Sequence, residues 1–256
     1  MKYYVVADVH GFYTELITAL TEKGFFEDKE PHKLIVCGDL FDRGLEAVKL
    51  QNFIVDLINK DEVILIRGNH EDLALELIKE WDKRSYLFGY HNSNGTVNTV
   101  LQLTNEKIIN ENNCDEIKKR LLNTPFIKKI IPNTIDYFET ENYIFVHGWI
   151  PCDALGYGGK ADTFCYKDNW REVDTYDWNY ARWFNGMEVA HKGVIEPNKT
   201  IVCGHWNSSY GHSVIEGKCS EFGSDADFSP YYGKGIIALD ACTAISTKVN
   251  CIVLDD

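Results

Sequence analysis

The chain has no long hydrophobic run and no closely paired cysteines. None of its apolar stretches approaches the roughly 18 residues that a membrane-spanning helix needs, and its 8 cysteines are scattered without a CxxC spacing. Its 39 Asp and Glu outnumber its 26 Lys and Arg, for a formal net charge of -13. Nucleic acid and membrane are therefore not expected as partners, because both call for a basic face. A strand pattern starts directly after Met1 and Lys2, so we expect no removable signal sequence and a reduced, cytoplasmic protein.

The first part of the chain alternates apolar runs with helical patterns. The apolar runs have the length of buried strands, and the expected strands are residues 3–7, 33–37 and 63–66. The expected helices lie near residues 13–23, 46–59 and 73–81. Strand and helix repeated in this order predict a parallel sheet that is covered by helices.

The rest of the chain has a different pattern of apolar and polar residues. Residues 82–124 are polar and Asn-rich with short helices such as 115–122, and we interpret them as an insertion or cap within one domain spanning 1–256. Further strands are expected at 126–131, 135–139 and 143–147, as an antiparallel meander, and at 200–203, 213–215, 235–239 and 249–254. Residues 151–176 are expected to form a surface loop near the substrate, followed by a helix at 178–184. This order predicts an α/β fold of two sheets packed face to face, with helices outside.

Five of the expected strands end in Gly together with Asp, Asn or His. The motifs are DVHG (8–11), GDLFDRG (38–44), GNHE (68–71), VHG (146–148) and GH (204–205). Because ligands in open α/β sheets bind beyond the carboxyl ends of the strands, these side chains can assemble one composite site. Carboxylate, imidazole and amide ligands without Cys suit divalent ions such as Mn2+, Fe2+, Zn2+ or Ni2+.

We predict two metal ions that share the Asp39 carboxylate. The remaining ligands divide between the ions, with Asp8 and His10 on one and Asn69, His147 and His205 on the other. Such a pair activates a bridging water and clamps the oxygens of an in-line phosphoryl transfer. Mn2+ is the first choice of metal, with Fe, Zn or Ni as alternatives.

Other residues of the chain suit the substrate phosphate and the leaving group. Arg43 and Arg182 are the candidates to bind the phosphate, because the planar guanidinium can bind it through two hydrogen bonds. His70 is the candidate general acid, and Asp42 can hold its imidazole and raise its pKa. Surface or structural roles are expected for the histidines without motif context, His32, His91, His191 and His212.

The three N-terminal motifs resemble those of the calcineurin-like metallophosphoesterases. The pattern D-x-H-G, G-D-x-x-D-R-G and G-N-H-E of the phosphoprotein phosphatase branch is matched residue for residue over 8–71, and the later histidine motifs extend the similarity. The resemblance implies a four-layer α-β-β-α sandwich with two mixed sheets. It also implies the metal ligands named above, His70 paired with Asp42 as the acid, and Arg43 with Arg182 on the phosphate.

Details of the later motifs refine the resemblance. Trp149 follows the later His-Gly pair where many relatives have a small residue, so the substrate groove there need not follow the family. Trp206 and Asn207 follow Gly204-His205 in place of a second His, as in the phosphoprotein phosphatase branch. Residues 239–242 loosely resemble the D-T-G-C of bacterial and phage members, which favours the bacterial type.

The sequence therefore predicts a metal-dependent phosphatase of the serine/threonine protein phosphatase type. It would hydrolyse phosphomonoesters, namely phosphoserine or phosphothreonine in proteins, by direct attack of a metal-bound hydroxide. A diadenosine tetraphosphatase, which splits a symmetrical dinucleoside polyphosphate, is the alternative within the same chemistry. A noncatalytic binding module is the alternative from another class, although such a module has no need of both a proton donor and a phosphate clamp.

Overall fold

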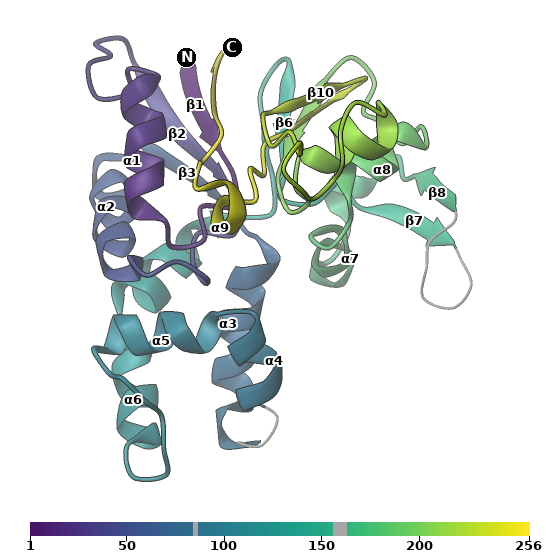
Figure 1. The fold of residues 1–256 in the computed structure, drawn as a ribbon. Coiled ribbons are helices and arrows are strands. Elements are labelled where there is room, and N and C mark those ends of the chain that lie inside the picture. The colour runs from purple at the N-terminus through teal and green to yellow at the C-terminus, as the bar shows by residue number, and fades with distance from the viewer. Residues whose placement is uncertain (84–86, 156–162) are drawn as a thin grey trace.

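Two mixed sheets face each other, with helices on their outer sides (Figure 1). The structure is a computed structural model that describes residues 1–83, 87–155 and 163–256. Val5 and Ile35 of the first sheet pack with Phe145, Val202 and Ile237 of the second in an apolar layer between the sheets. The predicted α-β-β-α sandwich is confirmed.

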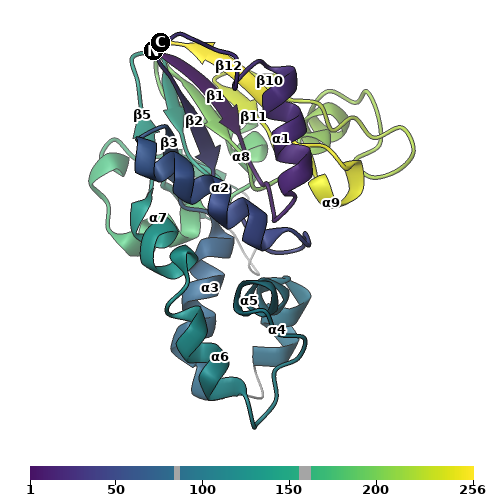
Figure 2. The ribbon, with the colours of Figure 1, turned by 90° about the vertical axis from the view of Figure 1, so that its left-hand side faces the viewer.

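The first sheet combines the N-terminal strands with the C-terminal one. Its order is β12-β1-β2-β3-β4, with β1 (Lys2–Val6), β2 (His32–Cys37), β3 (Val63–Ile66), β4 (Thr134–Ile135) and β12 (Cys251–Asp255). β1 to β4 run parallel, and β12 pairs antiparallel with β1. The two termini therefore lie together, and the Met1 amino group donates a hydrogen bond to the Asp256 carbonyl (Figure 2).

The side chains of the first sheet are buried on both faces. Val5 points into the layer between the sheets, whereas its neighbour Val6 packs in the cluster that contains Leu50 and Ile54 of the helix α2 (Ala47–Lys60). Successive strand residues point to opposite faces, so a sheet that is covered on both sides reads as a continuous apolar run. This two-sided burial is the reason that the N-terminal strands could be predicted.

The second sheet has the order β10-β11-β9-β6-β5. Its strands are β5 (Phe138–Glu139), β6 (Tyr143–Phe145), β9 (Thr200–Cys203), β10 (Tyr231–Gly233) and β11 (Ile236–Ala238). The central strands β6, β9 and β11 are parallel, and the edge strands β5 and β10 are antiparallel to their neighbours. The carboxyl ends of β6 and β9 thus leave the sheet at the same edge.

The helices fall into an outer set and a lower set. The outer set is α1 (Tyr13–Glu22) and α2 (Ala47–Lys60) on the first sheet, with α7 (Thr175–Ala181) and α8 (Gly186–His191) on the side of the second. The lower set, which extends below the sheets in Figures 1 and 2, is α3 (Asn69–Glu80), α4 (Leu87–Ser93), α5 (Thr96–Thr104) and α6 (Cys114–Leu121). A short helix, α9 (Thr243–Ser246), precedes β12. Across the described residues, every helix is too short or too polar to cross a membrane.

The lower helices share a small apolar cluster of their own. Leu77 and Trp81 from the end of α3 pack there with Val100 of α5 and with Ile117 and Leu121 of α6. The polar, Asn-rich segment 82–124 is therefore helical and packed where it is described.

Several expectations for the second half of the chain are wrong. Residues 126–131 are not a strand but the π-helical turn η2 (Phe126–Ile130) followed by the 3₁₀ turn η3 (Ile131–Asn133). Residues 213–215 lie in a second π-helical turn, η5 (Gly211–Ile215). The antiparallel meander is formed only between β5 and β6, because β4 belongs to the first sheet and the other partner of β6 is the parallel strand β9.

The expected loop at 151–176 also contains regular structure. β7 (Cys152–Leu155) and β8 (Thr163–Tyr166) form an antiparallel pair, and the 3₁₀ turn η4 (Trp170–Glu172) follows. Residues 156–162 lie outside the described part of the chain. A further 3₁₀ turn, η1 (Trp81–Lys83), continues α3.

Candidate active site

The ends of five strands converge in one buried cluster. It brings together the predicted side chains that follow β1, β2, β3, β6 and β9, namely Asp8, His10, Asp39, Asn69, His70, His147 and His205. Two groups, His10 with Asp39 and His70 and Asp39 with His147 and His205, each have potential ligand atoms within 4.8 Å of one another. Asp39 belongs to both groups. The fold thus places the side chains of these motifs close to one another.

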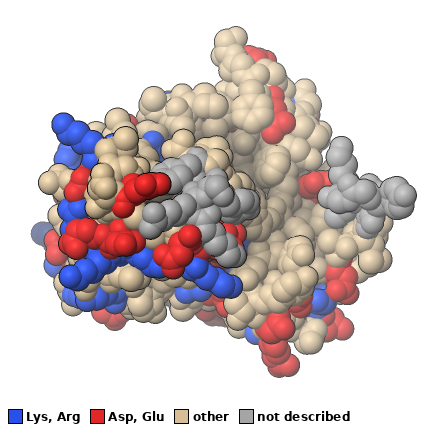
Figure 3. Space-filling view, turned by 90° about the horizontal axis from the view of Figure 1, so that it is seen from below, with Lys and Arg blue, Asp and Glu red and all other residues tan. Residues whose placement is uncertain are grey.

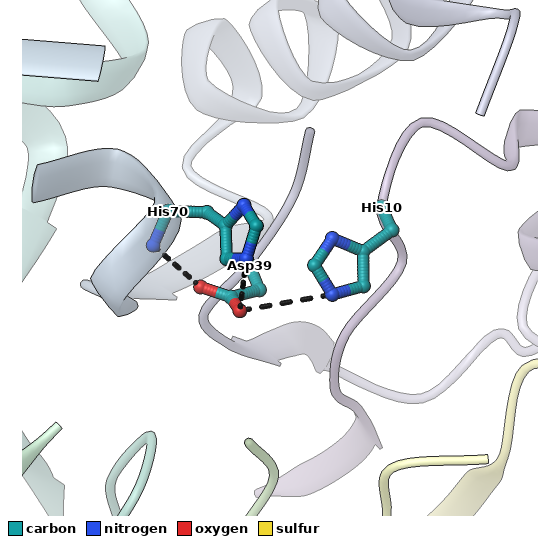
Figure 4. Close-up of side chains that lie close together, drawn as sticks. All are labelled: His10, Asp39 and His70. Carbon is teal, nitrogen blue, oxygen red and sulfur yellow. Dashed lines mark hydrogen bonds and ion pairs between the residues drawn. The ribbon is translucent and has the colours of Figure 1, made fainter. Parts of the chain in front are cut away.

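Asp39 occupies the centre of this cluster. Its carboxylate lies 3.7 Å from Nε2 of His10 and 3.8 Å from Nε2 of His70. Figure 4 shows the carboxylate between the two imidazoles. On its other side it lies 3.4 Å from Nε2 of His147, whose ring is 5.1 Å from that of His205. A single carboxylate therefore faces both groups of ligands.

The backbone turns sharply after the strands to bring these side chains together. Asp8, His10, Asp39 and His205 have positive φ values of 52°, 49°, 53° and 69°. Such left-handed backbone costs a non-glycine residue about 1 to 3 kcal/mol and persists where the surroundings hold it, often at functional sites. Gly204 is required next to His205, because a Cβ there would overlap the Asp8 carboxylate.

The charges of Asp39 and His147 stabilise each other. Burial alone would raise the pKa of Asp39, but His147 and His70 hold it well below its ordinary value. Burial alone would lower the pKa of His147, but the Asp39 carboxylate raises it to about 10. The centre of the cluster therefore holds a carboxylate that stays ionised and can bind a cation.

Two further carboxylates at the cluster point to a metal site. Burial, and then the neighbouring Asp240, raise the pKa of Asp8 well above its ordinary value. Burial likewise raises the pKa of Asp240 to about 6. Buried like charges disfavour each other's ionised forms, and a bound cation reverses that effect. The buried set of carboxylate, imidazole and amide donors thus fits divalent metal ions.

His70 and Asp42 form a buried hydrogen-bonded pair beside the cluster. Nδ1 of His70 lies 2.7 Å from Oδ2 of Asp42. Burial alone would lower the pKa of His70, but the carboxylates of Asp39 and Asp42 raise it above its ordinary value. A positioned imidazole that holds its proton is what a general acid requires.

Glu71 is a site residue that the motif analysis left without a role. Its buried carboxylate accepts hydrogen bonds from the backbone N–H groups of Asp39 (3.0 Å), Leu40 (3.0 Å) and Gly68 (2.7 Å). It thereby joins the loop after β2 to the start of α3. The signal in the sequence was its place as the third residue of a helix that follows Gly68, where Glu commonly caps the helix.

Glu71→Gln should lower the free energy of unfolding by about 1 to 3 kcal/mol, because an amide cannot accept all three bonds and leaves buried donors unpaired. Thermal or urea denaturation measures the effect, with Glu27→Gln at an exposed position as the matched control. Equal stability of the two variants would contradict this role of Glu71.

The two arginines predicted to bind phosphate differ in their surroundings. Arg43 is exposed, and its charge acts on His10 and His70. Arg182 is 2% exposed and forms ion pairs with Asp72, at 2.7 Å, and with Asp136. Its Nε is buried and has no hydrogen-bond partner among the residues that the structure describes. The guanidinium of Arg182 is thus already neutralised by two carboxylates, whereas that of Arg43 is exposed and can meet a ligand at the surface.

Two exposed tryptophans flank His205. The ring centroids of Trp183 and Trp206 lie 5.7 and 6.1 Å from that of His205, and the side chains are 46% and 39% exposed. Trp149 is instead buried in the core of the second sheet, where its Nε1 donates to the Val194 carbonyl at 3.1 Å. Of the two tryptophans noted in the later motifs, Trp206 is therefore at the surface and Trp149 is in the core.

The lower face of the molecule is hollowed in its middle. Figure 3 shows this face from below, with Lys, Arg and carboxylates gathered at the left, on the side of α6, and little charge over the hollow. In this region α6 carries basic and acidic residues together.

Comparison with known proteins is consistent with this geometry. The family model described as calcineurin-like phosphoesterase matches residues 1–233. Serine/threonine-protein phosphatase 2 of Salmonella typhimurium is 25% identical over 213 residues, which cover 83% of this chain and 80% of that protein. A symmetrical bis(5'-nucleosyl)-tetraphosphatase of Buchnera aphidicola subsp. Schizaphis graminum is 28% identical, over 84% of this chain and 86% of that protein.

Solved structures show the same fold. A cold-active protein-tyrosine phosphatase of a psychrophilic Shewanella species superposes with a TM-score of 0.55 at 18% sequence identity. The match covers 100% of this chain and 75% of that one.

Proposed function

The chain belongs to the calcineurin-like phosphoesterase family, and we propose that it is a two-metal phosphatase that hydrolyses phosphoserine and phosphothreonine in proteins. Asp8, His10 and Asp39 would hold one divalent ion, and Asp39, Asn69, His147 and His205 the other, with Mn2+ as the preferred metal. When bound, the two ions supply a hydroxide nucleophile and neutralise charge on the phosphate.

The buried pair of His70 and Asp42 carries the proposal. His70 lies beside Asp39 at the edge of the cluster and is hydrogen-bonded to Asp42. A serine or threonine alkoxide is a poor leaving group, so its departure requires a proton from a positioned acid. The phosphate chain of a nucleotide leaves as a stable anion and has less need of that acid.

The side chains around the cluster have separate roles in this proposal. Asp42 holds the imidazole of His70 so that Nε2 faces the cluster and can donate its proton to the leaving oxygen. Arg43, exposed at the rim, can bind the phosphate through its fork of N–H groups. Arg182 is the second candidate to bind the phosphate, and its guanidinium would have to exchange its ion pairs with Asp72 and Asp136 for that contact.

A second candidate activity has one observation in its favour. The exposed rings of Trp183 and Trp206 beside His205 can stack on a base, which supports hydrolysis of a symmetrical dinucleoside polyphosphate. The proposal of a protein phosphatase and this alternative share the same metal cluster.

Initial rates with added Mn2+ separate the two candidates. The substrates are a phosphoserine or phosphothreonine peptide, diadenosine tetraphosphate and para-nitrophenyl phosphate, assayed at equal concentrations. We expect the peptide to be hydrolysed faster than the dinucleotide. The reverse order would replace the proposal by the nucleotide activity, and the absence of metal-dependent turnover on every substrate would indicate a binding module.

A further inference from the structure

The helix α5 presents polar side chains to the loop that carries Asp42. Thr96, Thr99 and Gln102 recur every three residues and therefore lie on one face of the helix. We propose that Thr96 and Thr99 are positioning residues for proton donation, which orient Asp42 and through it His70. The inference rests on the proposed phosphatase function and assigns a role in it to the segment 82–124.

The two threonine hydroxyls fix both oxygens of the Asp42 carboxylate. Thr99 Oγ1 donates to Oδ1 at 2.8 Å, and Thr96 Oγ1 donates to Oδ2 at 2.9 Å. The second oxygen is the one that contacts Nδ1 of His70, at 2.7 Å. Thr96 and Thr99 are only 1% and 2% exposed, so water does not replace these bonds. The carboxylate is thus held in the plane and direction that aim the imidazole.

The backbone of Asp42 is held by the same helix. Its N–H donates to Thr99 Oγ1 at 3.0 Å, and its φ is 74°, in the left-handed region. One hydroxyl therefore bonds to both the main chain and the side chain of Asp42. A strained residue keeps its conformation only where neighbours over-determine it, and Thr99 supplies two of those contacts.

Further contacts dock α5 against this loop. Gln102 donates to the Gly44 carbonyl at 2.9 Å and accepts from the Ala47 N–H at 2.9 Å. Gly95, just before α5, lies so close to Arg43 that a Cβ would meet its backbone nitrogen at 2.5 Å. The docking surface spans the loop from Arg43 to Ala47, so α5 forms part of the wall of the site.

Not every buried threonine of α5 has such a role, and one of them provides a control. The hydroxyl of Thr104 donates to the Val100 carbonyl in the preceding turn, at 2.7 Å. Thr104 is buried on the same helix and shows no contact with Asp42 among its described hydrogen bonds. Thr104→Val therefore measures the effect of a threonine-to-valine substitution on α5 that removes no bond to Asp42.

The test compares two aryl phosphates that differ in their leaving group. Phenyl phosphate needs a proton donor for its poor leaving group, whereas para-nitrophenyl phosphate releases a stable anion. Thr99→Val should lower kcat on phenyl phosphate about tenfold at unchanged KM. The reason is that the free energy of one hydrogen bond to an ionised group corresponds to about a tenfold change in rate. Turnover of para-nitrophenyl phosphate should change less than about twofold. Thr99→Ser, which keeps the hydroxyl, should restore the rate on phenyl phosphate.

Three further variants separate the possible explanations of these rates. Thr104→Val should leave both rates unchanged, and Thr96→Val should reproduce the selective loss if Thr99→Val does not fold. Equal losses on both substrates, or no rescue by serine, would overturn the inference.

His70→Ala, measured alongside, distinguishes a failure of this inference from a failure of the proposed function. If His70→Ala leaves the rate on phenyl phosphate unchanged, the general acid in the proposed function is wrong. If it lowers that rate while both threonine variants match the wild type, only the role of α5 is wrong.

Discussion

Replacing Asp39 by asparagine should lower the affinity of the chain for divalent metal by at least about 100-fold, since even residues outside the ligand shell alter metal affinity by about 10- to 100-fold. The carboxylate of Asp39 faces His10 and His70 on one side and His147 on the other, and it belongs to both ligand groups. Asparagine keeps the shape but removes the charge, so both ions should be weakened together. Bound metal measured after dialysis and the rate on para-nitrophenyl phosphate report the loss.

The matched control is Asp61→Asn. Asp61 is exposed at the end of α2, and its left-handed backbone accommodates asparagine readily. This variant should retain metal and activity. If Asp39→Asn kept two tightly bound ions, the bridging role of Asp39 would be refuted.

Replacing His70 by alanine should slow hydrolysis of phenyl phosphate by about 100-fold or more, which is the usual contribution of a positioned acid. Turnover of para-nitrophenyl phosphate should fall much less, because its leaving group needs no proton. The physical reason is the raised pKa of His70, which burial alone would lower but Asp39 and Asp42 raise, so that the protonated imidazole is favoured. Steady-state rates on the two substrates measure the contrast.

His191→Ala, at an exposed position on α8, provides the control and should match the wild type. Metal content should be the same in His70→Ala as in the wild type. Equal losses on the two aryl phosphates would speak against His70 as the proton donor and in favour of a role in binding metal.

The N-terminal half of the fold could be predicted because its signals are local. Each strand from β1 to β3 is buried on two faces and ends at a Gly-containing motif, so that apolar runs and motifs mark the same boundaries. The turn η2 could not be recognised in this way. Its sequence FIKKI has the β-branched residues of a strand, yet Phe126 and Ile130, four residues apart, pack together with Leu50 and Ile54 of α2. Tertiary packing decides the conformation of so short a segment.

The candidate site also has one part that could be predicted from the sequence and one part that could not. Its cluster was predictable because each side chain follows a recognisable strand end. The support of Asp42 by Thr96 and Thr99 was not, because 54 and 57 residues separate them in the chain. Nor does any local pattern indicate that Asp240 faces Asp8, since the two residues come from opposite ends of the chain and meet through the sheets.

A metal titration tests the central claim most directly. The protein is stripped with a chelator, Mn2+ is added back stepwise, and bound Mn2+ is measured together with the initial rate on para-nitrophenyl phosphate. We predict that the stripped protein is inactive and that turnover returns as about two Mn2+ bind per chain. Full turnover by the metal-free protein, or binding of Mn2+ without any gain in rate, would contradict the assignment of this cluster as a catalytic metal centre.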